Sequence, residues 1–414
     1  MFILSIETSC DETAVSLVQA EGGLDSPSFT VLGDALFSQV ALHAPYGGVY
    51  PNLAKREHGK NLVPLMQQAL IKSGLQNLEA RNLNLEKIET DTIREILTKE
   101  EGLADATIEF LEKHGKPAID MIAVTSGPGL EPALWVGISF AIALGEAWGI
   151  PVIGTNHMKG HIASVLLNRS DEVKSQKSKV ESLNEEKFEI TTNTLAVQFP
   201  AIALLISGGH TEIVHIEKWG QYSILGKTRD DAVGEAFDKV ARMLALPYPG
   251  GPEVSRLAAQ ARDKHTQHSI TLPRPMIHSG DLDFSFSGLK TSVLYTLRDL
   301  KTELTDDIKM EIAREFEDAV VDVLLAKTEK ALIESGAQTL IIAGGVTANT
   351  RIREAFTNLI SHKYSDTILR ISEKDLSTDN AIMIAMASYI EILVHPEKLT
   401  HPLKIQAEGN LILS

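Results

Sequence analysis

The chain has 414 residues, of which 43% are hydrophobic and 23% charged, a composition typical of a globular protein that divides into two domains. Its net charge of −16 argues against a stand-alone nucleic-acid binder, which would need clustered Lys and Arg or a partner that supplies them. The only cysteine, Cys10, excludes an intrachain disulfide and a cysteine-based zinc site, and suits a reducing compartment.

The opening of the chain predicts two strands, Phe2–Thr8 and Thr13–Gln19, joined by an acidic turn at Ser9–Glu12. The middle of the chain repeats this plan, with strands at Ala201–Ile206 and Thr211–Ile216 around a Ser-Gly-Gly-His turn. Two similar hairpins half a chain apart indicate a duplicated α/β architecture. Two unrelated hairpins in an ordinary α/β protein fit the same pattern equally well.

Two further units join a strand to a helix through glycines. The apolar strand Ile119–Ser126 runs through Gly-Pro-Gly into a helical stretch at Ala133–Trp148, and Thr339–Ala343 runs through Gly-Gly into a helix that starts near Asn349. Such units place backbone N–H groups at a helix start, where phosphates bind well. Near the end of the chain, a polar cluster of the type that caps helices precedes the apolar run Ala381–Val394, which predicts a buried helix.

We expect an N-terminal lobe at 1–196 and a C-terminal lobe at 197–414, with the last helix packing back on the N-terminal lobe. Two stretches have the composition of insertions. The Glu-rich residues 75–116 predict an added helical pair, and the polar residues 168–193 predict a flexible linker. The chain has no apolar run of the roughly 20 residues that span a bilayer and opens without a leader-like segment, so we expect no membrane segment and no presequence.

His157 and His161 are four residues apart, a spacing that places both imidazoles on one face of a helix and lets them share a divalent metal. Two histidines at this spacing also occur by chance. Metalloproteases that use this spacing have Glu after the first histidine, and Met158 stands there instead. A third ligand has to come from elsewhere; Asp379 could supply it, although a helix N-cap is the stronger local interpretation of that residue.

Three glycine turns, at Ser207–Thr211, Tyr248–Pro252 and Ala343–Asn349, could bring backbone amides close to a phosphate. None matches the P-loop or dinucleotide-binding patterns. Asp231, Glu235 and Asp238 follow a helical spacing, and carboxylates beside a nucleotide can hold ribose hydroxyls or a cation. A solvated helix face is the stronger local interpretation of the three acidic residues.

Taken together, these motifs resemble one family, TsaD, which was formerly described as a group of sialoglycoprotein endopeptidases. The resemblance covers nearly the whole chain apart from the two insertions. It is carried, in chain order, by Ile6–Thr13, Tyr46–Pro51 with Arg56–His58, Ser126–Leu130, Asn156–His161, Ser207–Thr211, Gly234–Lys239, Tyr248–Pro252, Phe284–Thr291, Ala343–Asn349 and Thr378–Asn380. It implies a duplicated two-lobe fold of the actin/Hsp70/sugar-kinase type (ribonuclease-H-like).

The resemblance also implies the residues of the site. The matching metal ligands are His157, His161 and Asp379, which hold one iron or zinc ion per subunit. The positions that match the adenylate-binding residues are Leu205, Ile206, Ser207, Gly208 and Gly209, with Asp238 and Gly251 near the ribose and Asn349 near the base.

The implied reaction is the transfer of a threonylcarbamoyl group from threonylcarbamoyl-AMP to N6 of the adenosine 3′ of the anticodon, in tRNAs that read codons beginning with A. In this scheme the metal polarises the carbonyl and AMP leaves. Asp11 or Glu12 could orient the amine or accept its proton. Lys290 could contact phosphate or tRNA.

The resemblance leaves the partners open. Bacterial members act with a TsaB-like paralogue and a TsaE-like ATPase, whereas mitochondrial relatives work as homodimers. A bacterial cytoplasmic location is expected, or the mitochondrial matrix for an organellar member. The chain departs from the family pattern at two places. It has Glu131–Trp135 where bacterial members have a run of small residues, and Lys159 where an acidic residue is usual. These departures put the partner surface in doubt.

Three other functions compete with this assignment. A metal-dependent endopeptidase would need a glutamate after His157, and this chain lacks it. A sugar or acetate kinase shares the implied fold but would need transfer of the γ-phosphate of ATP. A nucleotide-gated assembly protein resembling actin or Hsp70 would bind nucleotide without modifying a substrate. The combination of His157, His161 and Asp379 argues against the last two, because neither class uses such a triad.

Overall fold

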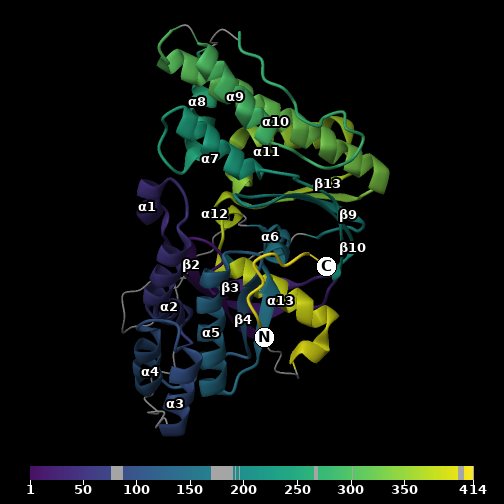
Figure 1. Cartoon of the computed structure of the whole chain (residues 1–414). Helices are drawn as coiled ribbons and strands as arrows, with labels where there is room; N and C mark the ends of the chain where they lie inside the picture. Colours follow the sequence, from purple (N-terminus) through teal and green to yellow (C-terminus); the bar gives the residue numbers. More distant parts are fainter. Residues whose placement is uncertain are drawn as a thin grey trace, which may run out of the picture. The chain divides into compact units, whose positions relative to one another are not determined.

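The computed structural model describes residues 1–75, 87–168, 190–191, 193–194, 196–264, 269–300, 302–399 and 405–413. The chain divides into two compact units, each shown in Figure 1. Unit 1 comprises Met1–Ala41, Val49–Ala196 and Asp379–Leu413, and unit 2 comprises Leu42–Gly48 and Val197–Thr378. The stretch Asp379–Leu413 near the end of the chain therefore belongs to the same unit as the beginning of the chain.

Unit 1 is built on a mixed sheet with strand order β5-β4-β1-β2-β3-β7. Neighbours are antiparallel from β1 through β2 and β3 to β7, and parallel from β1 through β4 to β5. The strands are β1 (Phe2–Glu7), β2 (Glu12–Glu21), β3 (Ser28–Ser38), β4 (Met121–Gly127), β5 (Val152–Asn156) and β7 (Ile190–Thr191). A separate short pair joins β6 (Leu167–Asn168) to β8 (Asn193–Thr194).

Helices cover both faces of this sheet, which is why its central strands β1 and β4 are buried along nearly their whole length instead of alternating between buried and exposed residues. Leu4 and Ile6 of β1 belong to a core shared with α2 (Pro51–Ser73) and α5 (Glu131–Trp148). The opposite face of the sheet packs on α13 (Ala381–Val394), which contacts β1, β2 and β5. The remaining helices of unit 1 are α3 (Lys87–Ile96), α4 (Leu103–Lys113), α6 (His157–Ser164) and the 3-10 turn η3 (Pro396–Leu399).

Unit 2 repeats the plan, with a sheet of order β11-β10-β9-β12-β13. Its strands are β9 (Ala201–Ile206), β10 (Thr211–Lys218), β11 (Gln221–Lys227), β12 (Thr339–Ala343) and β13 (Ile368–Ile371). Strand β10 is antiparallel to both of its neighbours, β9 and β11, whereas β12 and β13 run parallel to β9. Both sheets thus place their first five strands in the order third-second-first-fourth-fifth with the same directions. This confirms the predicted duplication and the actin/Hsp70/sugar-kinase type of fold.

The core of unit 2 lies between its sheet and its helices. Phe237 of α7 and Phe316 of α10 meet edge to face, with ring centroids 5.0 Å apart, and tie these two helices together. The helices are α7 (Val233–Met243), α8 (Gly250–Asp263), α9 (Ser287–Asp299), α10 (Asp306–Ser335), α11 (Thr350–Lys363), α12 (Lys374–Ser377) and the 3-10 turn η2 (Gly345–Ala348). The short α1 (Val40–His43) and η1 (Ala44–Tyr46) follow β3.

The predicted insertions fall partly outside the described residues. Residues 87–113 of the first form α3 and α4, whereas residues 76–86 are not described. The second, at 168–193, lies outside the described residues except for a few strand positions. Within the described part of the chain, no helix is long and apolar enough to cross a membrane.

Candidate functional site

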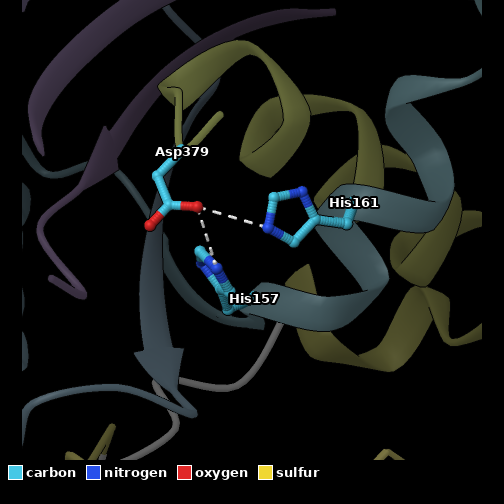
Figure 2. Close-up of side chains that lie close together, drawn as sticks. All are labelled: His157, His161 and Asp379. Carbon is cyan, nitrogen blue, oxygen red and sulfur yellow. Dashed lines mark ion pairs between the residues drawn. The ribbon is translucent and has the colours of Figure 1, made fainter. Parts of the chain in front are cut away.

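The three predicted metal ligands lie together in unit 1 (Figure 2). Helix α6 begins at His157, and the Asn156 side chain caps it by accepting hydrogen bonds from the backbone N–H groups of Met158 and Lys159. One turn later, His161 lies on the same face, with its ring 4.7 Å from that of His157. Asp379 approaches from the segment before α13, with Oδ1 3.3 Å from Nε2 of His157 and 3.2 Å from Nε2 of His161.

These distances fit a shared metal ion. Two ligand atoms that each lie 2.0–2.1 Å from a tetrahedral zinc ion are about 3.3 Å apart. His161 is fully buried, and neither of its ring nitrogens has a hydrogen-bond partner among the described residues, since the close approach of Asp379 does not have hydrogen-bond geometry. A buried imidazole without partners is costly unless something else binds it. A metal ion on Nε2 would remove the part of this cost that belongs to that nitrogen.

Asp379 is not the helix cap that its local sequence suggests. The N-cap of α13 is Asn380, whose Oδ1 accepts a hydrogen bond from the backbone N–H of Met383. The carboxylate of Asp379 is therefore not needed to cap the helix and lies against the two histidines. This observation favours the ligand interpretation over the capping interpretation.

A fourth residue, Glu7, belongs to the centre and was not predicted. It is fully buried, and its Oε2 lies 3.1 Å from Nδ1 of His157. Thr125 Oγ1 donates to the same oxygen at 2.6 Å, and the backbone N–H of Ser9 donates to Oε1 at 2.6 Å. A carboxylate that accepts from Nδ1 leaves the Nε2 lone pair of His157 free for a metal. The sequence signal that could have identified Glu7 is the presence of an acidic residue at the end of an apolar strand.

The charges in this centre are strongly coupled. Burial raises the pKa of Asp379, but His157 and His161 outweigh it and hold that pKa well below its usual range. Burial likewise raises the pKa of Glu7, and His157 brings it below normal. For His157 burial lowers the pKa, whereas Asp379 and Glu7 raise it well above the ordinary value. The centre thus stabilises a positive charge between two carboxylates, and metal binding there displaces a proton.

The acidic turn between β1 and β2 lies beside the same centre, since Ser9 Oγ is 3.3 Å from Nδ1 of His157. Asp11, in this turn, is nearly buried. Burial and the charges of Asp379 and Asp11 raise the pKa of Glu12 to about 10, so this carboxyl group is protonated near neutral pH in the metal-free protein. The proton-handling roles of Asp11 and Glu12 stay predictions.

Unit 2 contains a cavity of about 660 Å³ that brings together four of the eight predicted nucleotide-binding residues. These are Gly208, Asp238, Gly251 and Asn349, which come from four separate segments of the chain. The other four residues do not line this cavity. Leu205 and Ile206 lie in β9 with fully buried side chains, and Ser207 and Gly209 belong to the turn that follows it.

Hydrogen bonds hold the polar wall of this cavity in place. Asp238 Oδ1 accepts from the backbone N–H of Gly250 at 2.7 Å, at the start of α8. Asn349 caps α11, and its Nδ2 donates to Ser255 and to Glu317 Oε1, both at 2.7 Å. Glu317, which was not predicted, is buried and also pairs with Arg262 at 2.6 Å. No local pattern singles out Glu317, because its partners lie on other helices.

Lys290 and the acidic segment before α7 form a separate ion-pair group. Asp231 Oδ2 lies 3.0 Å from Nζ of Lys290, and Oδ1 lies 2.8 Å from Nζ of Lys239. The expectation that Asp231 shares a helix face with Glu235 and Asp238 is wrong, because α7 begins at Val233 and Asp231 precedes it. Asp231 forms ion pairs with these two lysines, and it is not among the residues that line the cavity.

Comparison with known proteins decides the assignment that the motifs and this geometry suggest. The model of the TsaD family, described as tRNA N6-adenosine threonylcarbamoyltransferase, matches residues 30–81, 100–176 and 180–386. The chain belongs to the TsaD family. The unmatched residues 82–99 include α3.

Relatives in the TsaD family align with nearly the whole chain. The protein named tRNA N6-adenosine threonylcarbamoyltransferase from Herminiimonas arsenicoxydans is 39% identical, over 96% of this chain and 94% of that protein. The protein of the same name from Burkholderia vietnamiensis is also 39% identical, with the same coverage. Among solved structures, HypF of T. kodakarensis has a TM-score of 0.46 and 11% identity, over 97% of this chain and 50% of that chain.

Proposed function

We propose that this chain transfers the threonylcarbamoyl group of threonylcarbamoyl-AMP to N6 of the adenosine 3′ of the anticodon, in tRNAs that read codons beginning with A. Support comes from the family match and from relatives of that name at 39% identity. The observation that carries the proposal is the cluster of His157, His161 and Asp379, with its 3.2 and 3.3 Å spacings around a common carboxylate oxygen.

The proposed cofactor is one divalent ion, iron or zinc, held by Nε2 of His157, Nε2 of His161 and the carboxylate of Asp379. Two histidines and one carboxylate suit both ions and leave positions open for substrate. When bound, the ion supplies Lewis-acid polarisation of a carbonyl oxygen. Glu7 holds the His157 ring in the orientation that directs Nε2 toward Asp379, and Asn156 fixes the start of the helix that carries both histidines.

The cavity of unit 2 is the proposed site of the adenylate. Its volume of about 660 Å³ lies within the range of small-molecule sites. Gly208 has no atom within 4 Å of the position that a Cβ would occupy, and Gly251 has only Phe237 Cβ at 4.0 Å, so a ligand can approach both backbones. The fixed side chains of Asp238 and Asn349 supply polar edges for the ribose and the base.

The acidic turn is the proposed site of proton transfer from the attacking amine. Asp11 and Glu12 are the candidate groups that orient the amine or accept its proton. For tRNA, the net charge of −16 calls for a local patch of Lys and Arg or for a partner that supplies one. The proposed partners are a TsaB-like paralogue with a TsaE-like ATPase, or a second copy of the chain, in the bacterial cytoplasm.

The test combines purified protein with unmodified tRNA, a threonylcarbamoyl-AMP synthase, ATP, threonine and bicarbonate, and analyses the digested tRNA by mass spectrometry. Threonylcarbamoyladenosine made by this chain alone supports a self-sufficient homodimer. Product that forms only after TsaB-like and TsaE-like proteins are added supports the heteromeric complex. Absence of product in both mixtures, with active synthase and bound metal, would overturn the proposal and direct attention to peptidase and kinase assays.

A further inference from the structure

His58, on α2 of unit 1, is a buried histidine that the proposed chemistry does not use. Its side chain is fully buried. Nε2 lies 3.1 Å from the backbone carbonyl oxygen of Cys10, and Nδ1 lies 2.8 Å from Thr13 Oγ1. Gln39 Nε2 also approaches Nδ1, at 3.4 Å. The ring thus spans the acidic turn, touching one residue on each side of Asp11 and Glu12.

The hydrogen-bond partners fix the tautomer of this ring. A carbonyl oxygen only accepts hydrogen bonds, so Nε2 of His58 carries a proton and donates it to Cys10. In the neutral imidazole, Nδ1 is then an acceptor, and the hydroxyl of Thr13 donates to it. Both ring nitrogens are satisfied, which makes the contact with the turn directional and not merely a packing contact.

The turn that His58 holds is also the turn that reaches the metal centre. Ser9 Oγ, on one side of Cys10, is 3.3 Å from Nδ1 of His157, and Ser9 N–H donates to Glu7. On the other side of Cys10, the carbonyl of Asp11 accepts a hydrogen bond from the backbone N–H of Gln39 at 2.9 Å. A shift of the Cys10 carbonyl would therefore move Ser9 and both acidic side chains together.

We propose that His58 is a positioning residue for the reaction, which anchors the Ser9–Glu12 turn through the Cys10 carbonyl and so sets the place of Asp11 and Glu12 beside the metal ligands. The inference rests on the proposed function. It assigns to His58 no contact with substrate or metal.

The chain offers a probe of this anchor that does not depend on activity, because Cys10 is its only cysteine. Partial burial and the nearby charges of Asp11 and Asp379 raise the pKa of the Cys10 thiol, so alkylation by iodoacetamide is slow while the turn is held. Alkylation of the full-length protein by iodoacetamide, followed by mass spectrometry, therefore reports directly on the turn.

Three variants separate anchoring from packing. His58→Phe keeps an aromatic ring but loses the hydrogen bonds to Cys10, Thr13 and Gln39. We expect Cys10 alkylation to be about tenfold faster and kcat to be lower by about 10- to 100-fold, since small misplacements of reacting groups have effects of this size. His58→Gln keeps an N–H donor within reach of Cys10 and should restore both values to near wild type. Thr13→Val removes only the hydroxyl that donates to Nδ1, and should leave both readouts close to wild type.

Metal content and the melting temperature are measured on every variant, and kcat and KM are determined with the complete set of subunits. Slower turnover of His58→Phe at unchanged metal content and KM, with rescue by His58→Gln, supports the positioning role. If kcat of His58→Phe equals that of the wild type, the positioning role is overturned, whether or not Cys10 is alkylated faster. A fall in kcat that His58→Gln fails to restore also overturns it. If the wild-type protein makes no product, the proposed function fails, and with it this role in the reaction, whereas alkylation still decides whether His58 anchors the turn.

Discussion

Glu7 and His157 are 150 residues apart in the sequence, yet Oε2 of the glutamate lies 3.1 Å from Nδ1 of the histidine inside unit 1. Both side chains are buried, and each shifts the pKa of the other toward the charged form against the effect of burial. The pair orients a histidine whose other nitrogen faces Asp379. Outer carboxylates of this kind affect metal affinity nearly as strongly as the ligands themselves.

Glu7→Gln should weaken metal binding without removing a ligand. The amide keeps the shape of the side chain but loses the charge that orients and polarises His157, so we expect the dissociation constant for zinc to rise about 10- to 100-fold. Competition with a chromophoric chelator measures it. The matched control is Glu100→Gln, because Glu100 is also buried in unit 1 but pairs with Lys55 instead, at 3.3 Å. Equal zinc affinities in wild type and Glu7→Gln would contradict the assigned role.

Two adjacent residues separate metal ligation from helix capping. Asp379→Asn removes the anionic ligand and leaves the Asn380 cap of α13 in place, so we expect the zinc affinity to fall by at least about 100-fold. Asn380→Ala should lower the free energy of unfolding by about 1 kcal/mol, as losses of N-caps do, and should retain metal binding. Titration with zinc and urea denaturation test both variants. If Asp379→Asn kept its zinc affinity but lost stability, Asp379 would have a structural role instead of a metal-binding one.

The sequence predicted the parts of this molecule that local patterns specify. Strand β12 at Thr339–Ala343 and helix α13 at Ala381–Val394 have the predicted bounds, because apolar runs between glycines and caps define them. Asp231 was wrongly placed on α7, since helical spacing continues past the true start and no side chain caps that helix. Glu7 and Glu317 could not be predicted, because their partners lie far away in the sequence. The choice of Asp379 as a ligand came from the family resemblance, not from its local sequence.

Asp230 caps α9 from a distant loop and gives a stability prediction with a definite pH dependence. Its Oδ1 accepts from the backbone N–H groups of Phe286 and Ser287, at 2.8 and 3.1 Å. Burial raises its pKa, but the hydrogen bonds of Ser285, Ser287 and Phe286 outweigh that effect and lower it. The charged form is thus favoured in the folded protein, and its contribution to stability is present above the unfolded pKa of about 3.9 and lost as the pH falls through the lower folded value.

We therefore expect Asp230→Ala to lower the free energy of unfolding by about 1 kcal/mol at pH 7, with a smaller difference from wild type below pH about 4. Urea denaturation at a series of pH values measures this. Asp299→Ala is the control, because Asp299 lies at the other end of α9, where a negative charge is unfavourable, and its side chain is 71% exposed. A difference between Asp230→Ala and wild type that grows toward low pH would contradict the sign of the shift.

Glycines in the cavity of unit 2 give a test of nucleotide binding that leaves the fold intact. Gly208 and Gly251 line the cavity and have open space where a Cβ would lie. Alanine at either position should change the free energy of unfolding by less than about 0.5 kcal/mol. In the proposed adenylate site each methyl group would fill space that the ligand occupies, so we expect AMP to bind at least about fivefold more weakly, because overpacking a closely fitted contact costs about 1–3 kcal/mol.

Calorimetric titration with AMP and thermal unfolding measure the two quantities for each variant. Gly288→Ala is the matched control, because Gly288 also has open space around a Cβ but lies on α9, away from the cavity. Gly234→Ala marks the opposite case, since its Cβ would lie 2.7 Å from the Ser207 carbonyl oxygen and should destabilise the fold itself. Unchanged AMP affinity in both cavity variants would show that the adenylate does not bind against these glycines, because their extra methyl groups could not be avoided by a ligand seated there.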